Sequence, residues 1–385
     1  MTAVQALEQA DVAIVGAGIA GAAAACFAAP HARVLLLERE PQPGLHSTGR
    51  SAAMFEESYG PAPVRALTRA SRAFLEQAPA GFAEAPLLRP RGALFIAAAE
   101  RLAPLRELQA TLRAEGVDAQ WLGTDEARAR CPVLRPEAVA AAVLDPGAAD
   151  IDVHALHQGY LRRARAAGAQ LRCSAEVLRI ERTAAGWRLH TPAGVVQAAV
   201  LVNAAGAWAD ELAARAGLAG VGLQPKRRSA FVFDPPAGLD VRDWPLVVDI
   251  DESFYIKPEA GLLLGSPANA DPVPAHDVMP EELDIATAIH RIEAATTLAI
   301  RRPRRSWAGL RSFVPDGSLV IGADPVEPAF VWLAAQGGYG IQSSAAAGEL
   351  AAALATTRWT GRPLPTWADA ALVHALRVRR PGGPA

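Results

Sequence analysis

Residues 11–21 are Asp11-Val12-Ala13-Ile14-Val15-Gly16-Ala17-Gly18-Ile19-Ala20-Gly21. The apolar run that ends in glycine predicts a buried strand, and the Ala-rich continuation to about Ala29 predicts a helix. In this pattern Gly16 permits the tight turn, Gly18 lets the backbone approach a pyrophosphate, and Gly21 lets the helix pack closely on the strand. The pyrophosphate would bind at the helix N-terminus, where free N–H groups and the helix dipole favour anions.

A second strand and an acidic residue complete this dinucleotide-binding pattern. Residues 34–37 (Val-Leu-Leu-Leu) predict a strand that ends at Glu38, 22 residues after Gly16. Glu38 is thereby placed to accept hydrogen bonds from ribose hydroxyls, and its carboxylate would repel the 2′-phosphate of NADP. The pattern does not separate FAD from NAD, and a plain Gly-rich turn is the alternative interpretation of the glycines alone.

Two more junctions of strand, glycine turn and helix occur later in the chain. Strand-like residues 195–203 run into Gly206 and a helix, and strand-like residues 330–335 run into the Gly-rich stretch 337–344 and an Ala-rich helix. A nicotinamide enzyme needs one such junction, whereas three fit a long cofactor held across one domain. The loop 43–53 contains small hydroxyl residues and glycines, and it is either a segment that approaches a ligand or an ordinary surface loop.

Composition excludes several other classes of protein. A chain of 385 residues, of which 51% are hydrophobic and 20% charged, can form two or three domains with a sizeable core. Its formal charge of −2 gives no global attraction for nucleic acid or anionic membranes. Cys26, Cys131 and Cys173 lack disulfide or zinc spacing, so we expect no metal site and a reducing compartment. The longest uncharged run, 12–32, is interrupted by the glycine pattern and has no basic flank before it, so we expect a cytoplasmic protein.

Several other segments have clear secondary-structure signals. Apolar spacing predicts helices over 64–75 and 101–115 and a strand over 93–96. Asp152 predicts the start of a helix, because its side chain can accept a hydrogen bond from a backbone N–H of the first turn. Strands are expected over 176–180 and 187–190. The Pro-rich region 224–300 is expected to be mostly strand.

Ten stretches together resemble the D-amino-acid oxidase superfamily of FAD enzymes, and most closely its bacterial D-arginine dehydrogenase branch. They are GAGIAGA, LEREPQPGLHSTGRSAA, ADIDVHALHQGYL, VLVNAAGAWAD, LQPKRRSAF, DESFYIKP, LLLGSPANADPV, ATTLAIRRP, WAGLRSF and AAQGGYGIQSSAA. They follow one another in order over nearly the whole chain. The resemblance implies an α/β fold, with an FAD-binding Rossmann-like domain (1–85, 146–223 and 306–385) into which a mixed-sheet α+β substrate domain (86–145 and 224–305) is inserted.

The resemblance also implies noncovalent FAD, because no cysteine follows Cys173 where sarcosine-type relatives attach their flavin. Glu38 would bind the adenosine ribose, Arg39 would lie near the adenine, and Val177 would contact the cofactor through its backbone. The stretch from Gly337 to Gln342 would follow the pyrimidine edge of the flavin. The candidate cofactor-binding residues are Gly16, Gly18, Ile19, Ala20, Gly21, Glu38, Arg39, Ser47, Thr48, Arg50, Ser51, Ala52, Ala53, Val177, Gly206, Trp208, Arg311, Gly337, Gly338, Tyr339, Gly340, Ile341 and Gln342.

For catalysis, the resemblance implies oxidative deamination of a D-amino acid. The candidate catalytic residues are Tyr59, Arg228, Tyr255, Arg311, Gly338 and Gln342. The arginines and tyrosines would hold the substrate carboxylate through charge-assisted hydrogen bonds, and the Gly338 carbonyl would take the amine. A hydride would pass from Cα to flavin N5, and the imino acid would hydrolyse to a 2-keto acid and ammonia. Without the resemblance, the residues alone favour a solvated charge at a strand end for Arg228 and a structural ion pair for Arg311.

Two positions depart from the arginine-handling branch. Where that branch has a histidine and an acidic residue, this sequence has Met54 and Ala93. Both changes remove polar partners for a cationic side chain. We therefore expect Met54 and Ala93 to form an apolar pocket that favours D-leucine, D-methionine or D-phenylalanine over D-arginine.

Alternative functions remain open from the sequence. An oxidase or dehydrogenase of glycine, N-methyl amino acids or cyclic secondary amino acids would use the same residues. The basic clusters 226–228 and 301–305 leave open a relative that acts on tRNA, although the balanced charge argues against nucleic acid. A flavin-binding protein without catalysis is the remaining alternative. The electron acceptor, O₂ or a quinone-like or dye-like compound, is not specified.

Overall fold

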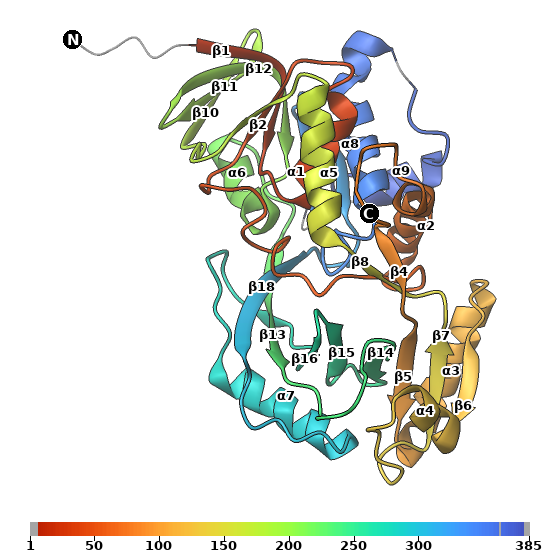
Figure 1. Cartoon of the computed structure of the whole chain (residues 1–385). Coiled ribbons are helices and arrows are strands. Elements are labelled where there is room, and N and C mark those ends of the chain that lie inside the picture. The colour runs from red at the N-terminus through yellow and green to blue at the C-terminus, as the bar shows by residue number, and fades with distance from the viewer. Residues whose placement is uncertain (1–6, 362, 381–385) are drawn as a thin grey trace.

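The first sheet contains the predicted dinucleotide-binding strands. The computed structural model describes residues 7–361 and 363–380 (Figure 1). The parallel strands of this sheet run in the order β9, β2, β1, β12, β20. Antiparallel β19 continues the sheet beyond β20, and the hairpin of β10 and β11 pairs with the first half of β12. The bounds are β1 (Leu7–Val15), β2 (Val34–Leu37), β9 (Gln170–Arg172), β10 (Arg179–Thr183), β11 (Gly186–Thr191), β12 (Gly194–Asn203), β19 (Val320–Ala323) and β20 (Phe330–Ala334).

Helices cover both faces of this sheet. Val12 and Ile14 of β1 point to one face and join the core formed by α1, α5 and α8. Ala13 and Val15 point to the other face, toward α6, as the two-residue period of a strand requires. Helix α1 is buried along nearly its whole length because it packs against α5, α8 and the sheet. The bounds are α1 (Ile19–Ala28), α5 (Val153–Ala166), α6 (Ala209–Arg215) and α8 (Ser344–Thr360).

The second sheet is mixed and lies below the first in Figure 1. On one edge, β13 pairs with β18. On its other edge, β13 pairs with β17 and β16, and from β16 the sheet continues through β15, β14, β5 and β7 to β6. Its helix α7 packs on β13 and β16, and α3 packs on β5 and β7. The bounds are β5 (Ala93–Ala97), β6 (Gln120–Gly123), β7 (Ala141–Asp145), β13 (Gln224–Phe233), β14 (Leu246–Asp249), β15 (Tyr255–Glu259), β16 (Leu262–Ser266), β17 (Asp271–Pro272), β18 (Arg305–Phe313), α3 (Leu102–Ala114), α4 (Thr124–Arg130) and α7 (Glu282–Ala295).

A small third sheet lies between the two large ones. In this sheet β8 pairs with both β3 and β4. Because β3 follows the loop after β2 and β4 comes just before β5, the small sheet connects that loop with the second sheet. Helix α2 packs against α8 and α9 on the outer side. The bounds are β3 (Met54–Phe55), β4 (Leu88–Pro90), β8 (Ala149–Ile151), α2 (Ala62–Glu76) and α9 (Ala370–Leu376), with short 3-10 turns η1 (Ala99–Arg101) and η2 (Gly206–Trp208).

The predicted α/β class is confirmed, with corrections to single elements. The region 224–300, expected to be mostly strand, contains the helix α7, whose buried residues Ile285, Ala288 and Ile292 recur at helical spacing. The strand expected over 176–180 begins only at Arg179, where the pairing with β11 starts. The division into domains stays a prediction, and its ends at 1–6 and 381–385 lie outside the described residues.

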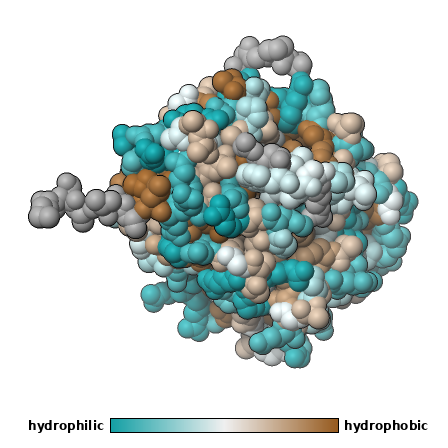
Figure 2. Space-filling view, turned by 90° about the horizontal axis from the view of Figure 1, so that it is seen from above, coloured by the Kyte–Doolittle hydropathy of each residue, from teal (hydrophilic) through white to brown (hydrophobic). Residues whose placement is uncertain are grey.

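The surface of the upper face mixes hydrophilic and hydrophobic residues without one broad apolar area (Figure 2). Among the residues that the structure describes, no helix is both long and apolar enough to cross a membrane.

Candidate active site

Two pockets join end to end beneath the helix junctions predicted from the sequence. The first is lined by Glu38, Arg39, Val177 and Trp208. The second is lined by strands of the second and third sheets, by the start of α1 and by the loops that follow β12 and β20. Both pockets are lined by Gly18, Ser47, Thr48, Ala204, Gly206 and Ala207. Their empty volumes, including space that opens to solvent, are about 870 and 1620 Å³. The result is a long cavity whose middle lies at the N-terminus of α1.

The turn before α1 has the close packing that the glycine pattern predicts. Gly16 has a φ of +100°, and a Cβ there would lie 2.3 Å from the carbonyl oxygen of Ala204. A Cβ on Gly21 would lie 1.9 Å from the oxygen of Gly16, so Gly21 lets the helix approach the turn. Gly21 itself lines neither pocket. Its role is therefore in packing, as the pattern implies, rather than in direct contact with a ligand.

The first pocket has the residues expected for an adenosine end. The Glu38 carboxylate is buried and accepts hydrogen bonds from the backbone N–H groups of Ala17, at 2.8 Å, and Glu40, at 3.0 Å. The guanidinium of Arg39 lies over the Trp208 ring, 4.8 Å from its centroid. These contacts fix the carboxylate and present a flat cationic and aromatic surface beside it.

The middle of the loop 43–53 is held in place by bonds to α1 and to the second sheet. The Thr48 hydroxyl accepts a hydrogen bond from the first helical N–H of α1, that of Ile19, at 2.9 Å. The Ser47 hydroxyl donates to the Leu310 carbonyl of β18 at 2.7 Å. Arg50 lines the second pocket, but its guanidinium donates to the carbonyls of Val278 and Ala308 and pairs with Asp277. The Arg50 charge therefore holds the loop to the second sheet.

The second pocket brings together the six candidate catalytic residues. Its lining includes Tyr59, Arg228, Tyr255, Arg311, Gly338 and Gln342. They come from the loop before α2, from β13, β15 and β18, and from the Gly-rich turn before α8. Residues more than a hundred positions apart in the chain therefore share one cavity.

Arg228 and Arg311 are half-buried guanidiniums that have no carboxylate within 4.0 Å in the described part of the chain. Burial and the neighbouring Arg311 cation both lower the pKa of Arg228. Arg311 interacts through its side chain with the Tyr59 hydroxyl. The pKa of Tyr255 is lowered: burial opposes the shift, but the two arginines outweigh it. Two guanidiniums and two phenols that line one cavity, with no described carboxylate within 4.0 Å of either guanidinium, form a site for an anion.

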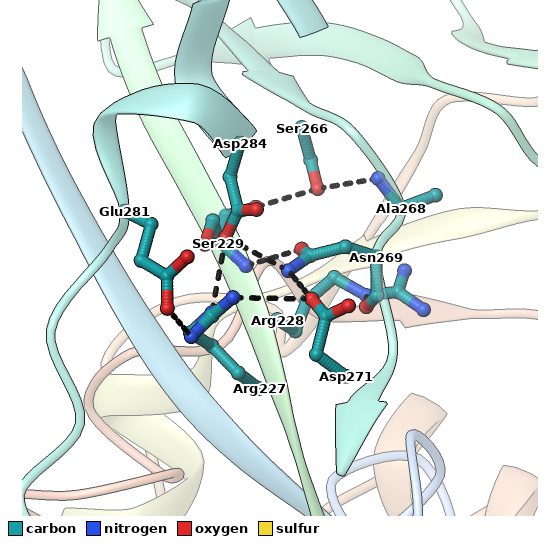
Figure 3. A network of polar contacts seen from close by, with 9 residues as sticks. All are labelled: Arg227, Arg228, Ser229, Ser266, Ala268, Asn269, Asp271, Glu281 and Asp284. Carbon is teal, nitrogen blue, oxygen red and sulfur yellow. Dashed lines mark hydrogen bonds and ion pairs between the residues drawn. The ribbon is translucent and has the colours of Figure 1, made fainter. Parts of the chain in front are cut away.

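A network of hydrogen bonds and ion pairs around Asn269 holds the Nε of Arg228 in place (Figure 3). The Arg228 Nε donates to the Asn269 carbonyl at 2.6 Å, and the Asn269 side-chain oxygen accepts from the Ser229 N–H at 2.8 Å. The Asn269 amide nitrogen donates to Asp284 at 3.0 Å. Asp284 also pairs with buried Arg227 at 3.0 Å. Arg227 therefore neutralises the acids of this network, and Arg228 is left free to point into the pocket.

Three predicted residues do not line either pocket. Besides Gly21, these are Tyr339, which packs against Tyr59 with ring centroids 5.0 Å apart, and Ala93. Ala93 is fully buried in a cluster with Ala148 and Leu246, against which Met54, Phe95 and Tyr255 pack. The expectation that Ala93 faces the substrate is therefore wrong, because its side chain is covered by these neighbours and lines neither pocket. The remaining candidates, including Met54, line one pocket or both.

Sequence reasoning missed two carboxylates in the second pocket, Glu56 and Glu252. Glu56 is half-buried and lies two residues after Met54; Glu252 is exposed and follows β14. Burial, together with Asp145 and Glu252, raises the pKa of Glu56 to about 7, against the opposing effect of Arg311. Period-two alternation from Met54 through β3 could have indicated Glu56. The pocket wall is therefore not purely apolar, contrary to the expectation from Met54 and Ala93.

The comparisons with known proteins agree with this geometry. A family described as FAD dependent oxidoreductase (DAO) matches residues 11–354. The chain belongs to this family. It is 31% identical to the glycine oxidase of Geobacillus kaustophilus (strain HTA426) over 336 residues, which cover 82% of this chain and 84% of the relative.

Solved structures of DAO-type flavoenzymes have the same fold. The crystal structure of glycine oxidase from Geobacillus kaustophilus superposes with a TM-score of 0.82 at 26% identity, over 97% of this chain and 99% of that one. L-α-glycerophosphate oxidase from Mycoplasma pneumoniae, solved with FAD bound, superposes with a TM-score of 0.81 at 20% identity, over 92% of this chain and 96% of that one. The predicted family and the FAD dependence are thereby confirmed.

The residues present fit a bound FAD. The joined pockets form one long cavity, with the Glu38 and Trp208 end suited to adenosine and the Gly337–Gln342 end suited to a flavin. None of Cys26, Cys131 and Cys173 lines either pocket. Burial raises the pKa of Cys26 to about 11 and that of Cys131 to about 12, so both thiols stay protonated at neutral pH. No cysteine of the described chain is thus placed to attach the cofactor.

Proposed function

We propose that this FAD-dependent oxidoreductase oxidises α-amino acids of D configuration, with noncovalently bound FAD, to the imino acid and then the 2-keto acid and ammonia. The observation that carries the proposal is the pair Arg228 and Arg311, two guanidiniums without acidic partners that face one pocket with Tyr59 and Tyr255. An α-amino acid has an obligatory carboxylate that this site can take. The D configuration rests on the resemblance to the D-arginine dehydrogenase branch.

The chain's own residues would orient the substrate rather than activate it by strong acid or base. Two guanidiniums at the carboxylate fix its plane through paired charge-assisted hydrogen bonds. The Gly338 carbonyl, on the same cavity wall, would accept a hydrogen bond from the amine. Bound FAD would supply the hydride acceptor. Orientation of this kind contributes to the rate because it fixes the reacting atoms close together before the reaction.

The expected preference for apolar side chains is not part of this proposal. It assumed that Ala93 and Met54 form an apolar wall, whereas Ala93 lies outside the pocket and Glu56 lies inside it. Met54, Phe95 and Val248 still supply apolar surface. The wall is therefore mixed, with apolar surface and the carboxyl group of Glu56.

The alternative substrate class is glycine or N-methyl and cyclic secondary amino acids. The similarity to glycine oxidase over 82% of the chain favours it. Such substrates have the same carboxylate, so Arg228 and Arg311 would serve them equally. They differ in the space that they need beyond Cα, and Met54, Phe95 and Val248 are the apolar residues of the second pocket that would contact a longer side chain.

The first of the two basic clusters that left a nucleic-acid substrate open, 226–228, has partners within the fold, and the second has them in part. Arg227 pairs with acids, Arg228 faces the pocket, and Lys226 lies 5.1 Å from the centroid of the Phe313 ring. In the second cluster, Arg304 pairs with Asp234 at 2.9 Å. The amino-acid substrate is therefore the better explanation of the site.

An anaerobic reduction screen tests the proposal. The purified flavoprotein is mixed with D- and L-amino acids, glycine, sarcosine and D-proline, and the loss of flavin absorbance is followed. Fast reduction by D-amino acids with side chains supports the proposal. Reduction by glycine or sarcosine alone supports the alternative, and no reduction by any of them refutes both. Turnover in air and with a quinone-like dye then identifies the class of electron acceptor.

A further inference from the structure

Glu56 is held in place by its backbone while its carboxylate stays free. Its N–H donates to the Gln342 side-chain oxygen at 3.1 Å, and the Gln342 amide nitrogen donates to the Thr68 hydroxyl at 3.1 Å. Gln342 is buried, so this chain of bonds ties the residue after β3 to α2. Within residues 7–361 and 363–380, the Glu56 carboxylate has no hydrogen bond or ion pair, although it lines the second pocket.

The neighbouring Glu57 shows what an ordinary glutamate does in this segment. Its carboxylate accepts a hydrogen bond from Arg72 of α2 at 2.7 Å and forms an ion pair there. Glu57 does not line the pocket. The two adjacent glutamates therefore differ in one respect that matters: Glu57 has a partner in the protein, and Glu56 faces the cavity without one. An unpartnered, half-buried carboxylate is costly for the fold unless a ligand supplies its partner.

The rest of the pocket defines which ligand group could reach Glu56. Arg228 and Arg311 take a carboxylate, and Met54, Phe95 and Val248 offer apolar surface. A substrate that satisfies all three features has a carboxylate, an aliphatic stem and a positively charged end.

We infer that Glu56 binds the cationic end of the substrate side chain, so that the enzyme prefers D-lysine, D-arginine or similar basic amino acids over neutral ones. The inference rests on the proposed function, because it names the substrate class for the same site. It replaces the expectation of an apolar pocket. The carboxylate that this sequence lacks at position 93 is supplied from position 56, on a different element of the pocket.

The charges around Glu56 give the preference a pH dependence. Asp145 at the end of β7 and Glu252 after β14 face it with like charge, while Arg311 of β18 opposes them; Arg228, Tyr59 and Tyr255 line the same pocket. With its pKa at about 7, Glu56 is partly protonated at neutral pH when no ligand is bound. A cationic side chain favours the ionised form, so binding releases a proton near pH 7.

The experiment compares D-lysine with D-norleucine, which has the same stem without the charge. In the parent enzyme kcat/KM for D-lysine should exceed that for D-norleucine roughly 10- to 100-fold at pH 8. This ratio should fall by up to roughly tenfold between pH 8 and pH 6, because Glu56 becomes protonated. The α-ammonium group titrates in both substrates and cancels in the ratio.

The matched variants are Glu56→Gln and Glu57→Gln. Glu56→Gln should bring the ratio close to one and remove its pH dependence, whereas Glu57→Gln should keep both. A binding readout independent of turnover comes from calorimetry with 6-aminohexanoate and hexanoate, which lack the α-amino group. 6-Aminohexanoate should bind more tightly and release a proton at pH 7, and both differences should disappear in Glu56→Gln.

The outcomes separate the two proposals. A parent enzyme that oxidises D-norleucine as well as D-lysine, or a Glu56→Gln variant that keeps the preference, overturns the inference and leaves the proposed function standing. If no amino acid reduces the flavin, yet 6-aminohexanoate binds better than hexanoate through Glu56, the proposed function is wrong and the assignment of Glu56 holds. Equal binding of the two acids overturns the assignment.

Discussion

Replacing Arg311 by methionine isolates the anion site from the rest of the fold. Arg311 lies on β18, lines the second pocket and shares a hydrogen bond with the Tyr59 hydroxyl. Methionine keeps much of the side-chain volume and removes the charge. The substitution therefore takes away half of the proposed carboxylate clamp while the neighbouring backbone, paired with β13, is unchanged.

The expected loss follows from the missing charge. A hydrogen bond to a charged group contributes about 1.5–3 kcal/mol, so kcat/KM for an amino acid should fall roughly 10- to 150-fold. The unliganded protein should not be destabilised by a comparable amount. Arg311→Met loses about 1 kcal/mol with the Tyr59 hydrogen bond, but it also removes the repulsion with Arg228, which already lowers the pKa of that residue. The two effects on stability oppose each other.

The assay pairs steady-state kinetics with thermal unfolding of substrate-free, FAD-loaded protein, and Arg227→Met is the matched control. Arg227 is buried among Asp284, Glu281 and Asp271, so its loss leaves acids without a partner and should cost about 3 kcal/mol of stability. Arg311→Met should lower kcat/KM with Tm nearly unchanged and with normal FAD content. If Arg311→Met kept parental kcat/KM, or lost stability as Arg227→Met does, the assignment of Arg311 to the carboxylate would be refuted.

Three further predictions concern the same cavity. The pKa of Glu56 in the folded protein is about 7, above its ordinary value of 4.5, so ionisation of Glu56 destabilises the fold as the pH rises from 4.5 to 7. Glu56→Gln should therefore raise the Tm of the substrate-free enzyme at pH 8 but not at pH 5. An equal shift of Tm at both pH values would contradict an unpaired carboxylate. Asn269→Ala should raise KM roughly tenfold, with little change in FAD content, because it loosens the segment whose carbonyl holds Arg228; unchanged KM would argue against this support. Acid precipitation should release all the FAD into the supernatant, and yellow colour that stays with the precipitate would indicate a covalent bond.

The first sheet could be predicted closely from the sequence because its signals are local. The strand before Gly16, the strand before Glu38 and the three glycine junctions lie where the sequence indicates. Each depends on a short run of residues whose own backbone demands the turn. The helix α7 was missed for the opposite reason, since its apolar residues are separated by charged ones in a region dominated by prolines. There the tertiary packing on β13 and β16 decides the structure.

The resemblance to the D-arginine dehydrogenase branch supplied the candidate site, and the structure decided the orientation of its members. Nothing in the spacing of Arg227 and Arg228 tells which of two adjacent arginines faces a cavity. Their partners decide it: Arg227 forms an ion pair with Asp284, whereas the Arg228 Nε donates to the Asn269 carbonyl. In the same way, the resemblance predicts that position 93 contacts the substrate, but Ala93 is fully buried in a cluster with Ala148 and Leu246.

Glu56 shows why the substrate specificity of such a pocket cannot be inferred by comparing one residue position at a time with a related family. The pocket wall is built from the third sheet, from β13, β14 and β18 of the second, and from the turn before α8. A charge that the substrate needs can enter from any of these elements, because Coulomb attraction depends on distance within the cavity and not on which strand carries the group. Loss of an acid at position 93 therefore does not remove the acid from the pocket. The charge of the pocket is the sum over all charged groups that line it, and in this chain these include the guanidiniums of Arg228 and Arg311 and the carboxylates of Glu56 and Glu252.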